Sequence, residues 1–89
     1  MKKNSYPVDV ISVCNADGEI RPLRLRLNRT DAEPVIIHIS DVLKVTEIVF
    51  VGVESHVFLC RANQQGKEIL FELKYTFSSH SWCLLRRIC

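Results

Sequence analysis

The chain concentrates half of its twelve Lys and Arg residues in two short segments, at Arg21, Arg24, Arg26, Arg29, Arg86 and Arg87. A guanidinium group binds phosphate or carboxylate through two parallel hydrogen bonds, which an ammonium group cannot form. The sequence therefore predicts an arginine-lined binding surface for an anionic partner, with nucleic acid as one candidate.

Two arrangements of these arginines are compatible with the sequence. If the segments that carry them come close in the fold, Arg24 and Arg26 form a positive stripe with one of the two terminal arginines. Alternatively, each arginine lies on a solvated strand face and pairs with Glu47, Glu68 or Glu72. The net charge of +2 at pH 7 does not distinguish the two arrangements.

The histidines and cysteines do not form a catalytic or metal-binding pattern. His56 and Cys60 lie four residues apart, which on a strand separates them by roughly 13 Å, too far for a hydrogen bond. His80 and Cys83 lie near a turn, but a structural zinc site needs two such ligand pairs. No GxSxG, P-loop or HExxH motif is present. We therefore expect no catalytic residue, no metal, no cofactor and no enzymatic activity.

The composition indicates one small globular domain that spans residues 1–89. The hydrophobic fraction is 47% and the charged fraction is 25%, which excludes a disordered chain. No apolar run approaches the roughly 18 residues that a transmembrane helix needs, and Asp9 interrupts the first apolar segment early. The four cysteines are scattered and are expected to be reduced. We expect a soluble cytoplasmic protein that does not enter membranes.

Hydrophobic residues recur with a period of two along most of the chain, which is typical of half-buried antiparallel strands. Turn residues separate the alternating segments, as in "NADG", "NQQG" and "SSHS". The segment "SDVLKV", residues 40–45, offers an N-cap and room for one helical turn. We expect strands at 7–14, 20–28, 35–40, 44–51, 56–62, 67–77 and 82–88.

The alternation also predicts which side chains enter the core. In 20–28 we expect Leu23, Leu25 and Leu27 to share the core face, with Pro22 at a sheet edge or at the start of regular pairing. In the last strand we expect Trp82, Leu84 and Ile88 on one face. The core face of 67–77 is expected to carry Ile69, Phe71, Leu73, Tyr75 and Phe77.

These elements predict an all-β fold, a single antiparallel meander of six or seven strands. A sheet in so short a chain can protect its edges by curling into a small barrel or by bending strongly, and we expect an SH3-like or Sm-like barrel. We expect a non-enzymatic binding module. The first alternative is a protein–protein interaction or homo-oligomerisation module that uses exposed strand edges or the apolar segment "IVFVGV". The second, which the spacing disfavours, is a small enzyme or metal-binding domain that uses His56, His80 and the cysteines.

The stretches "NADGEIRPLRLRL", "VIIHISDVLKV" and "WCLLRR" resemble the small uncharacterised proteins of Gram-positive bacteria, particularly clostridia. More distantly, the chain is similar to the YolD-like and WYL-like Sm/SH3-type barrels, which are thought to act in regulation or beside translesion DNA polymerases. The Trp-Tyr-Leu tripeptide that names the WYL group is absent. The resemblance therefore implies a small β-barrel with an arginine-lined β surface at Arg24 and Arg26, and no catalytic residue.

Overall fold

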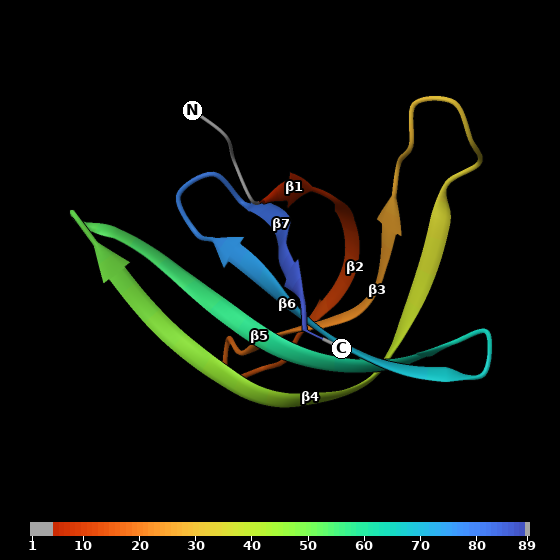
Figure 1. Ribbon diagram of the computed structural model, residues 1–89. Helices are drawn as coiled ribbons and strands as arrows, with labels where there is room; N and C mark the ends of the chain where they lie inside the picture. Colours follow the sequence, from red (N-terminus) through yellow and green to blue (C-terminus); the bar gives the residue numbers. More distant parts are fainter. Residues whose placement is uncertain (1–4, 89) are drawn as a thin grey trace.

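The computed structural model describes residues 5–88, and this part of the chain forms seven strands and no helix (Figure 1). All neighbouring strands are antiparallel, and they form one curled sheet in the order β1-β7-β6-β5-β4-β3-β2. The prediction of an all-β antiparallel meander is confirmed. Across the described residues, no helix could cross a membrane. The strands are β1 (Tyr6–Pro7), β2 (Asp9–Cys14), β3 (Ile20–Leu27), β4 (Val35–Phe50), β5 (Val53–Gln64), β6 (Lys67–Thr76) and β7 (Ser81–Arg87).

One continuous segment forms both edges of the sheet. β1 pairs with β7 and β2 pairs with β3, and only Val8 separates β1 from β2. Val8 is buried, and its N–H donates to the carbonyl oxygen of Trp82 over 3.3 Å. The predicted first strand is thus divided at Val8, because its two parts pair with opposite edges. This exchange of partners holds the sheet in its curl.

The core lies inside the curl, and β6 contributes the regular face that the sequence predicts. Ile69, Phe71, Leu73 and Tyr75 are all buried, and Phe77 packs against them while partly exposed. The other buried hydrophobic residues are Val8, Leu25, Ile37, Phe58, Cys60 and Ala62.

The predicted helical turn at residues 40–45 is wrong, because the two strands expected around it form the single strand β4. The pairing with β5 shifts between Ile39 and Asp41 and again between Val42 and Lys44. These β-bulges bend the strand and let it leave β3 and continue beside β5. Since β5 pairs with this segment on both sides of each bulge, the local capping preference of the segment is overridden.

A bulge in β3 overturns one predicted core residue. In the β2–β3 register, Ser12 lies opposite Pro22 and Ile11 opposite Arg24, which leaves Leu23 as the extra residue. Leu23 is consequently 44% exposed, whereas Pro22 is fully buried. Pro22 lies in the part of β3 that pairs with β2 alone, because pairing with β4 begins at Arg24. The prediction that Leu23 shares the core face with Leu25 and Leu27 is therefore wrong.

A bulge in β7 has the same kind of effect. Leu84 lies opposite Leu73 and Arg86 lies opposite Glu72, so Leu85 is the extra residue. Trp82 and Leu84 pack against the core as predicted. Ile88 is 43% exposed, and the prediction that it shares their face is wrong because the bulge exchanges the two faces of the strand.

Candidate anion-binding groove

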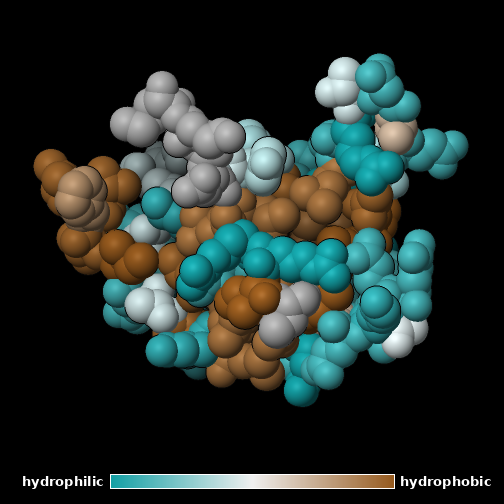
Figure 2. Space-filling view, viewed as in Figure 1, coloured by the Kyte–Doolittle hydropathy of each residue, from teal (hydrophilic) through white to brown (hydrophobic). Residues whose placement is uncertain are grey.

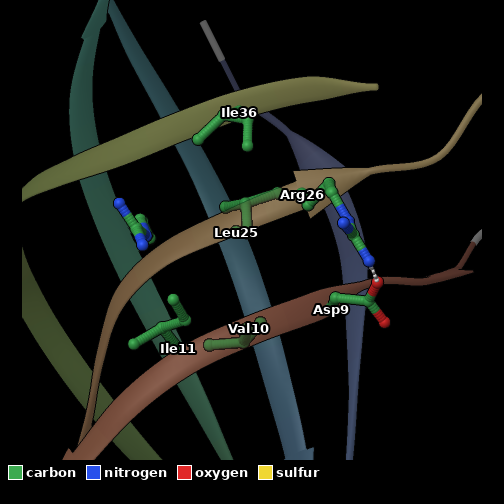
Figure 3. Close-up of a pocket in the computed structure, with 7 residues that line it drawn as sticks. Asp9, Val10, Ile11, Leu25, Arg26 and Ile36 are labelled. Carbon is green, nitrogen blue, oxygen red and sulfur yellow. Dashed lines mark hydrogen bonds and ion pairs between the residues drawn. The ribbon is translucent and has the colours of Figure 1, made fainter. Parts of the chain in front are cut away.

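Arg24 and Arg26 lie on the outer face of the curled sheet. Leu25 between them is 1% exposed, and its partners Val10 and Ile37 also belong to the core or pack against it. Because successive side chains on a strand point to opposite faces, the two arginines point outward. They border a shallow groove of about 360 Å³ on β2, β3 and β4, here called the outer groove. Its lining residues are Asp9, Val10, Ile11, Arg24, Leu25, Arg26 and Ile36 (Figure 3).

Asp9 holds Arg26 at one end of the outer groove. The Nη2 and Nε atoms of Arg26 donate to Oδ2 of Asp9 over 2.7 and 3.2 Å, and the two side chains point toward each other in Figure 3. Asn28 Nδ2 donates to the same oxygen over 3.1 Å. These hydrogen bonds, that from Arg26 first, lower the pKa of Asp9 below its ordinary value. Arg26 is therefore positioned, with part of its charge compensated.

Arg24 is the uncompensated cation of the outer groove. Within residues 5–88 it makes no hydrogen bond or ion pair. Its neighbours in the register are Ile11 on β2 and His38 on β4. The two arginines lie two residues apart, so their Cα atoms are about 7 Å from each other along the strand. This spacing suits two guanidinium groups that contact one anionic partner.

Exposed isoleucines flank the arginines. Ile11 is 49% exposed and Ile36 is 51% exposed, and they reach the groove from β2 and β4 respectively (Figure 3). Neither isoleucine is among the residues that the sequence predicts for a binding surface, although Ile36 falls on the polar side of the alternation that places Val35 and Ile37 inside. An apolar residue out of phase with its strand is the signal that could have identified it.

The structure does not bring the remaining arginines to this groove. Arg21 lines a separate cavity of about 570 Å³, whose acidic lining residues are Glu19, Asp41 and Glu47. Arg86 donates from Nε to Oε1 of Glu72 over 3.0 Å on the outer side of β7. The stripe of Arg24, Arg26 and a terminal arginine is therefore not formed, and the Glu72 pairing expected for a solvated face is observed.

Arg29 and Arg87 both line a third cavity, of about 220 Å³, which lies at one end of the curl between the connection that follows β3 and the end of β7. One of these two arginines comes from each arginine-rich segment of the sequence. They line a cavity on the inner side of the sheet, whereas Arg24 and Arg26 face outward.

The histidines and cysteines lie in different surroundings, and each contacts different groups. Cys60 is fully buried, and burial raises the pKa of its thiol to about 12. The ring of His56 packs edge-on against Phe77, with ring centroids 4.8 Å apart. His80 Nδ1 lies 2.9 Å from the hydroxyl of Tyr75. Among residues 5–88, no three His, Cys, Asp or Glu side chains are grouped as metal ligands.

Comparison with known proteins found no matching family model, no matching curated protein and no matching solved structure. The resemblance to the clostridial proteins and to the YolD-like and WYL-like barrels stays a prediction.

Proposed function

We propose that this chain is a small, non-enzymatic, cytoplasmic binding module of the SH3-like or Sm-like kind. Its outer groove binds an anionic partner that carries phosphate groups, and nucleic acid is the class to test first. One observation carries the proposal: Arg24 is exposed beside Arg26 and has no partner within the described residues.

The chemistry of the outer groove favours contacts to a phosphate backbone over the reading of bases. Arg24 can donate two parallel hydrogen bonds to one phosphate, and Arg26 is held ready beside it by Asp9. Within the described part of the chain, none of the groove-lining residues is aromatic, so these residues offer bases no stacking platform. Binding should therefore be independent of sequence and strongly dependent on salt.

Fluorescence anisotropy with a labelled random-sequence oligonucleotide tests this function. We expect binding at low ionic strength that weakens as salt is added, and its loss in the double variant Arg24→Ala with Arg26→Ala. Arg86→Ala is the control, because it removes one arginine that faces outward elsewhere and is paired with Glu72. Absence of binding at about 20 mM salt, where phosphate contacts are strongest, would overturn the proposal.

A second candidate function, homo-oligomerisation, rests on the β4–β5 hairpin. This hairpin projects from the body of the molecule, and its end, residues 48–53, is called the hairpin tip here (Figure 1). Val49, Phe50 and Val51 are 71%, 73% and 83% exposed, and they form a hydrophobic surface at the left of Figure 2. A contiguous exposed apolar surface is typical of an interaction site.

The edge of β4 beside the hairpin tip also lacks a partner strand. β3 pairs only with residues Val35 to His38 of β4, and β5 covers the opposite edge from Ile39 onward. Between Lys44 and Phe50, within the described chain, one edge of β4 therefore presents unpaired backbone groups. Such an edge can add a strand from a second copy.

Sedimentation velocity over a wide concentration range tests this second function. We expect an association that the double variant Val49→Ser with Phe50→Ser abolishes, while Ile11→Ser leaves it unchanged. Ile11 is a suitable control because it is an exposed apolar residue far along the sheet from the hairpin. A mass that stays monomeric at every concentration would remove this candidate.

A further inference from the structure

One end of the curled sheet contains an apolar cavity whose lining shares only Leu25 with that of the outer groove. β3, β5 and β7 end here, and β4 and β6 begin here. The β3–β4 and β5–β6 connections lie on the same side of the molecule in Figure 1. The cavity measures about 220 Å³ and is here called the inner cavity. Its lining residues are Leu25, Leu27, Arg29, Val35, Ile37, Gln64, Ile69, Phe71, Leu84 and Arg87.

The floor of the inner cavity is part of the hydrophobic core. Leu25, Ile37, Ile69 and Phe71 are all at most 8% exposed, so the cavity opens directly onto buried apolar side chains. Hydrophobic surface is visible inside the curl at the centre of Figure 2, bordered by hydrophilic residues. An apolar ligand entering here would exchange water contacts for contacts with these side chains.

The β7 bulge places an arginine at this apolar cavity. Because Leu85 is the extra residue, Arg87 lies opposite Phe71, whose side chain is 2% exposed and belongs to the core. Without the bulge, Arg86 would take that position, and Arg87 would face outward. Bulges commonly redirect a side chain in this way. Phe71 thus forms part of the apolar wall of this cavity, and Arg87 places a cationic group at its rim.

Arg29 supplies a second guanidinium from the other side of the inner cavity. It lies in the connection between β3 and β4, is exposed, and makes no hydrogen bond or ion pair within residues 5–88. Among residues 5–88, Gln64 is the remaining polar residue of the lining, and none of these lining residues carries a carboxylate. The described lining therefore combines an apolar interior with two guanidinium groups at its rim.

We propose that the inner cavity binds a small amphipathic carboxylate, with its hydrocarbon part against Phe71 and its carboxylate between Arg29 and Arg87. Two arginines on one rim suit a planar anion, because each guanidinium donates in a fork that matches carboxylate geometry. The cavity volume equals that of about seven water molecules, which limits the buried part of the ligand to a short chain or a single ring.

Hexanoate is the probe for this site, with hexan-1-ol and acetate as matched partial ligands. Titrations followed by two-dimensional ¹H–¹⁵N NMR report both the affinity and the place of binding. We expect hexanoate to shift the amide signals of Leu27, Val35, Ile69 and Leu84 and to bind at least about tenfold more tightly than either control. Hexan-1-ol lacks the carboxylate that the arginines would bind, and acetate lacks the hydrocarbon chain that would contact the apolar wall.

Arginine variants test whether the two rim arginines, and not arginines elsewhere on the molecule, contribute to hexanoate binding. The double variant Arg29→Gln with Arg87→Gln should weaken hexanoate binding about tenfold, the equivalent of one charge-assisted hydrogen bond. Arg86→Gln makes the same change at the adjacent residue, which faces outward, and should leave the affinity unchanged. Val35→Phe should block the cavity without altering the charge of the rim.

Three outcomes would overturn the proposal. The first is equal affinity for hexanoate and hexan-1-ol, which would show that the arginines do not contribute. The second is unchanged affinity in the double variant when its NMR spectrum retains the dispersion of the folded protein. The third is that hexanoate shifts signals only around Arg24 and Arg26, which would assign carboxylate binding to the outer groove. Failure of oligonucleotide binding leaves each of these measurements intact, so the two proposals are judged separately.

Discussion

Leu23 and Leu25 lie two positions apart in β3, yet Leu23 is 44% exposed and Leu25 is 1% exposed. The β-bulge at Leu23 removes it from the core and places Pro22 inside. Regular alternation would give these leucines the same environment, so their difference tests the register directly.

Leu25→Ala should destabilise the protein by about 2–5 kcal/mol, because it leaves a cavity in the core. Leu23→Ala should change stability by no more than about 0.5 kcal/mol, as expected for an exposed position. Urea denaturation of both variants measures the two values. Equal losses would show that β3 pairs without the bulge.

Val51 has a φ angle of 51°, a left-handed conformation that β-branched residues rarely adopt. With Gly52 at φ 77°, it forms the two-residue turn of the β4–β5 hairpin, where Asn-Gly is the preferred pair. Val51→Asn should therefore stabilise the fold by about 1 kcal/mol, which raises Tm by about 4–8 °C in a domain of this size.

Gly52→Ala is the opposite change at the same turn. Apart from Gly52 and its two chain neighbours, no atom lies within 4 Å of the added Cβ, so the loss of stability comes from the positive φ and not from a clash with the rest of the fold. Calorimetry should show a lower Tm for Gly52→Ala and a higher Tm for Val51→Asn. A lower Tm for both would mean that Val51 makes contacts that compensate its strained backbone.

Because the thiol of Cys60 is buried, the free energy of unfolding should fall at alkaline pH. Burial raises the pKa of its thiol from 9.0 to about 12, so between these values the thiol ionises in the unfolded chain before it ionises in the folded one. Its contribution is complete below pH 9 and is lost as pH rises, by at most about 1.4 kcal/mol per pH unit.

Denaturant unfolding of the wild type and of Cys60→Ala between pH 8 and 10 measures this effect. The variant should be less stable at neutral pH, because it removes a buried side chain, but the stability difference between the two proteins should shrink above pH 9. Other groups titrate in both proteins, and their effects cancel in the comparison. A difference that is constant over this range would contradict the buried, protonated thiol.

Asp9 should show the opposite pH dependence, since Arg26 and Asn28 lower the pKa of its carboxyl group below 3.8. The stabilisation is present above the pKa of the unfolded chain and is lost as pH falls through the pKa of the folded protein. A ¹³C NMR titration of the Asp9 carboxyl should find a low pKa in the wild type and a rise toward 3.8 in Arg26→Gln.

Asn28→Ala serves as the comparison, and its smaller rise would establish Arg26 as the main cause. The same pKa in all three proteins would mean that the pair is absent in solution. That result would also remove the argument that Asp9 positions Arg26 in the outer groove.

The sequence by itself determined which segments are extended and much of the core. In residues 67–77 the period-two pattern placed Ile69, Phe71, Leu73 and Tyr75 inside, and all are buried. Such patterns are readable because side-chain direction along a regular strand depends only on local backbone geometry. The turns could also be predicted from local sequence, because Gly18, Gly52 and Gly66 adopt the positive φ angles that the turns require.

Only the tertiary structure decided where the regularity fails and which surfaces meet. The bulges at Leu23 and Leu85 arise from the register between strands, which no local pattern encodes, and each reverses the direction of the side chains beyond it. The bulge in β7 places Arg87 inside, whereas Arg24 keeps the outward direction that alternation with Leu25 gives it, so arginines that look equivalent in the sequence belong to different sites. Partner choice over long sequence distances, rather than local preference, divides the six arginines among those sites.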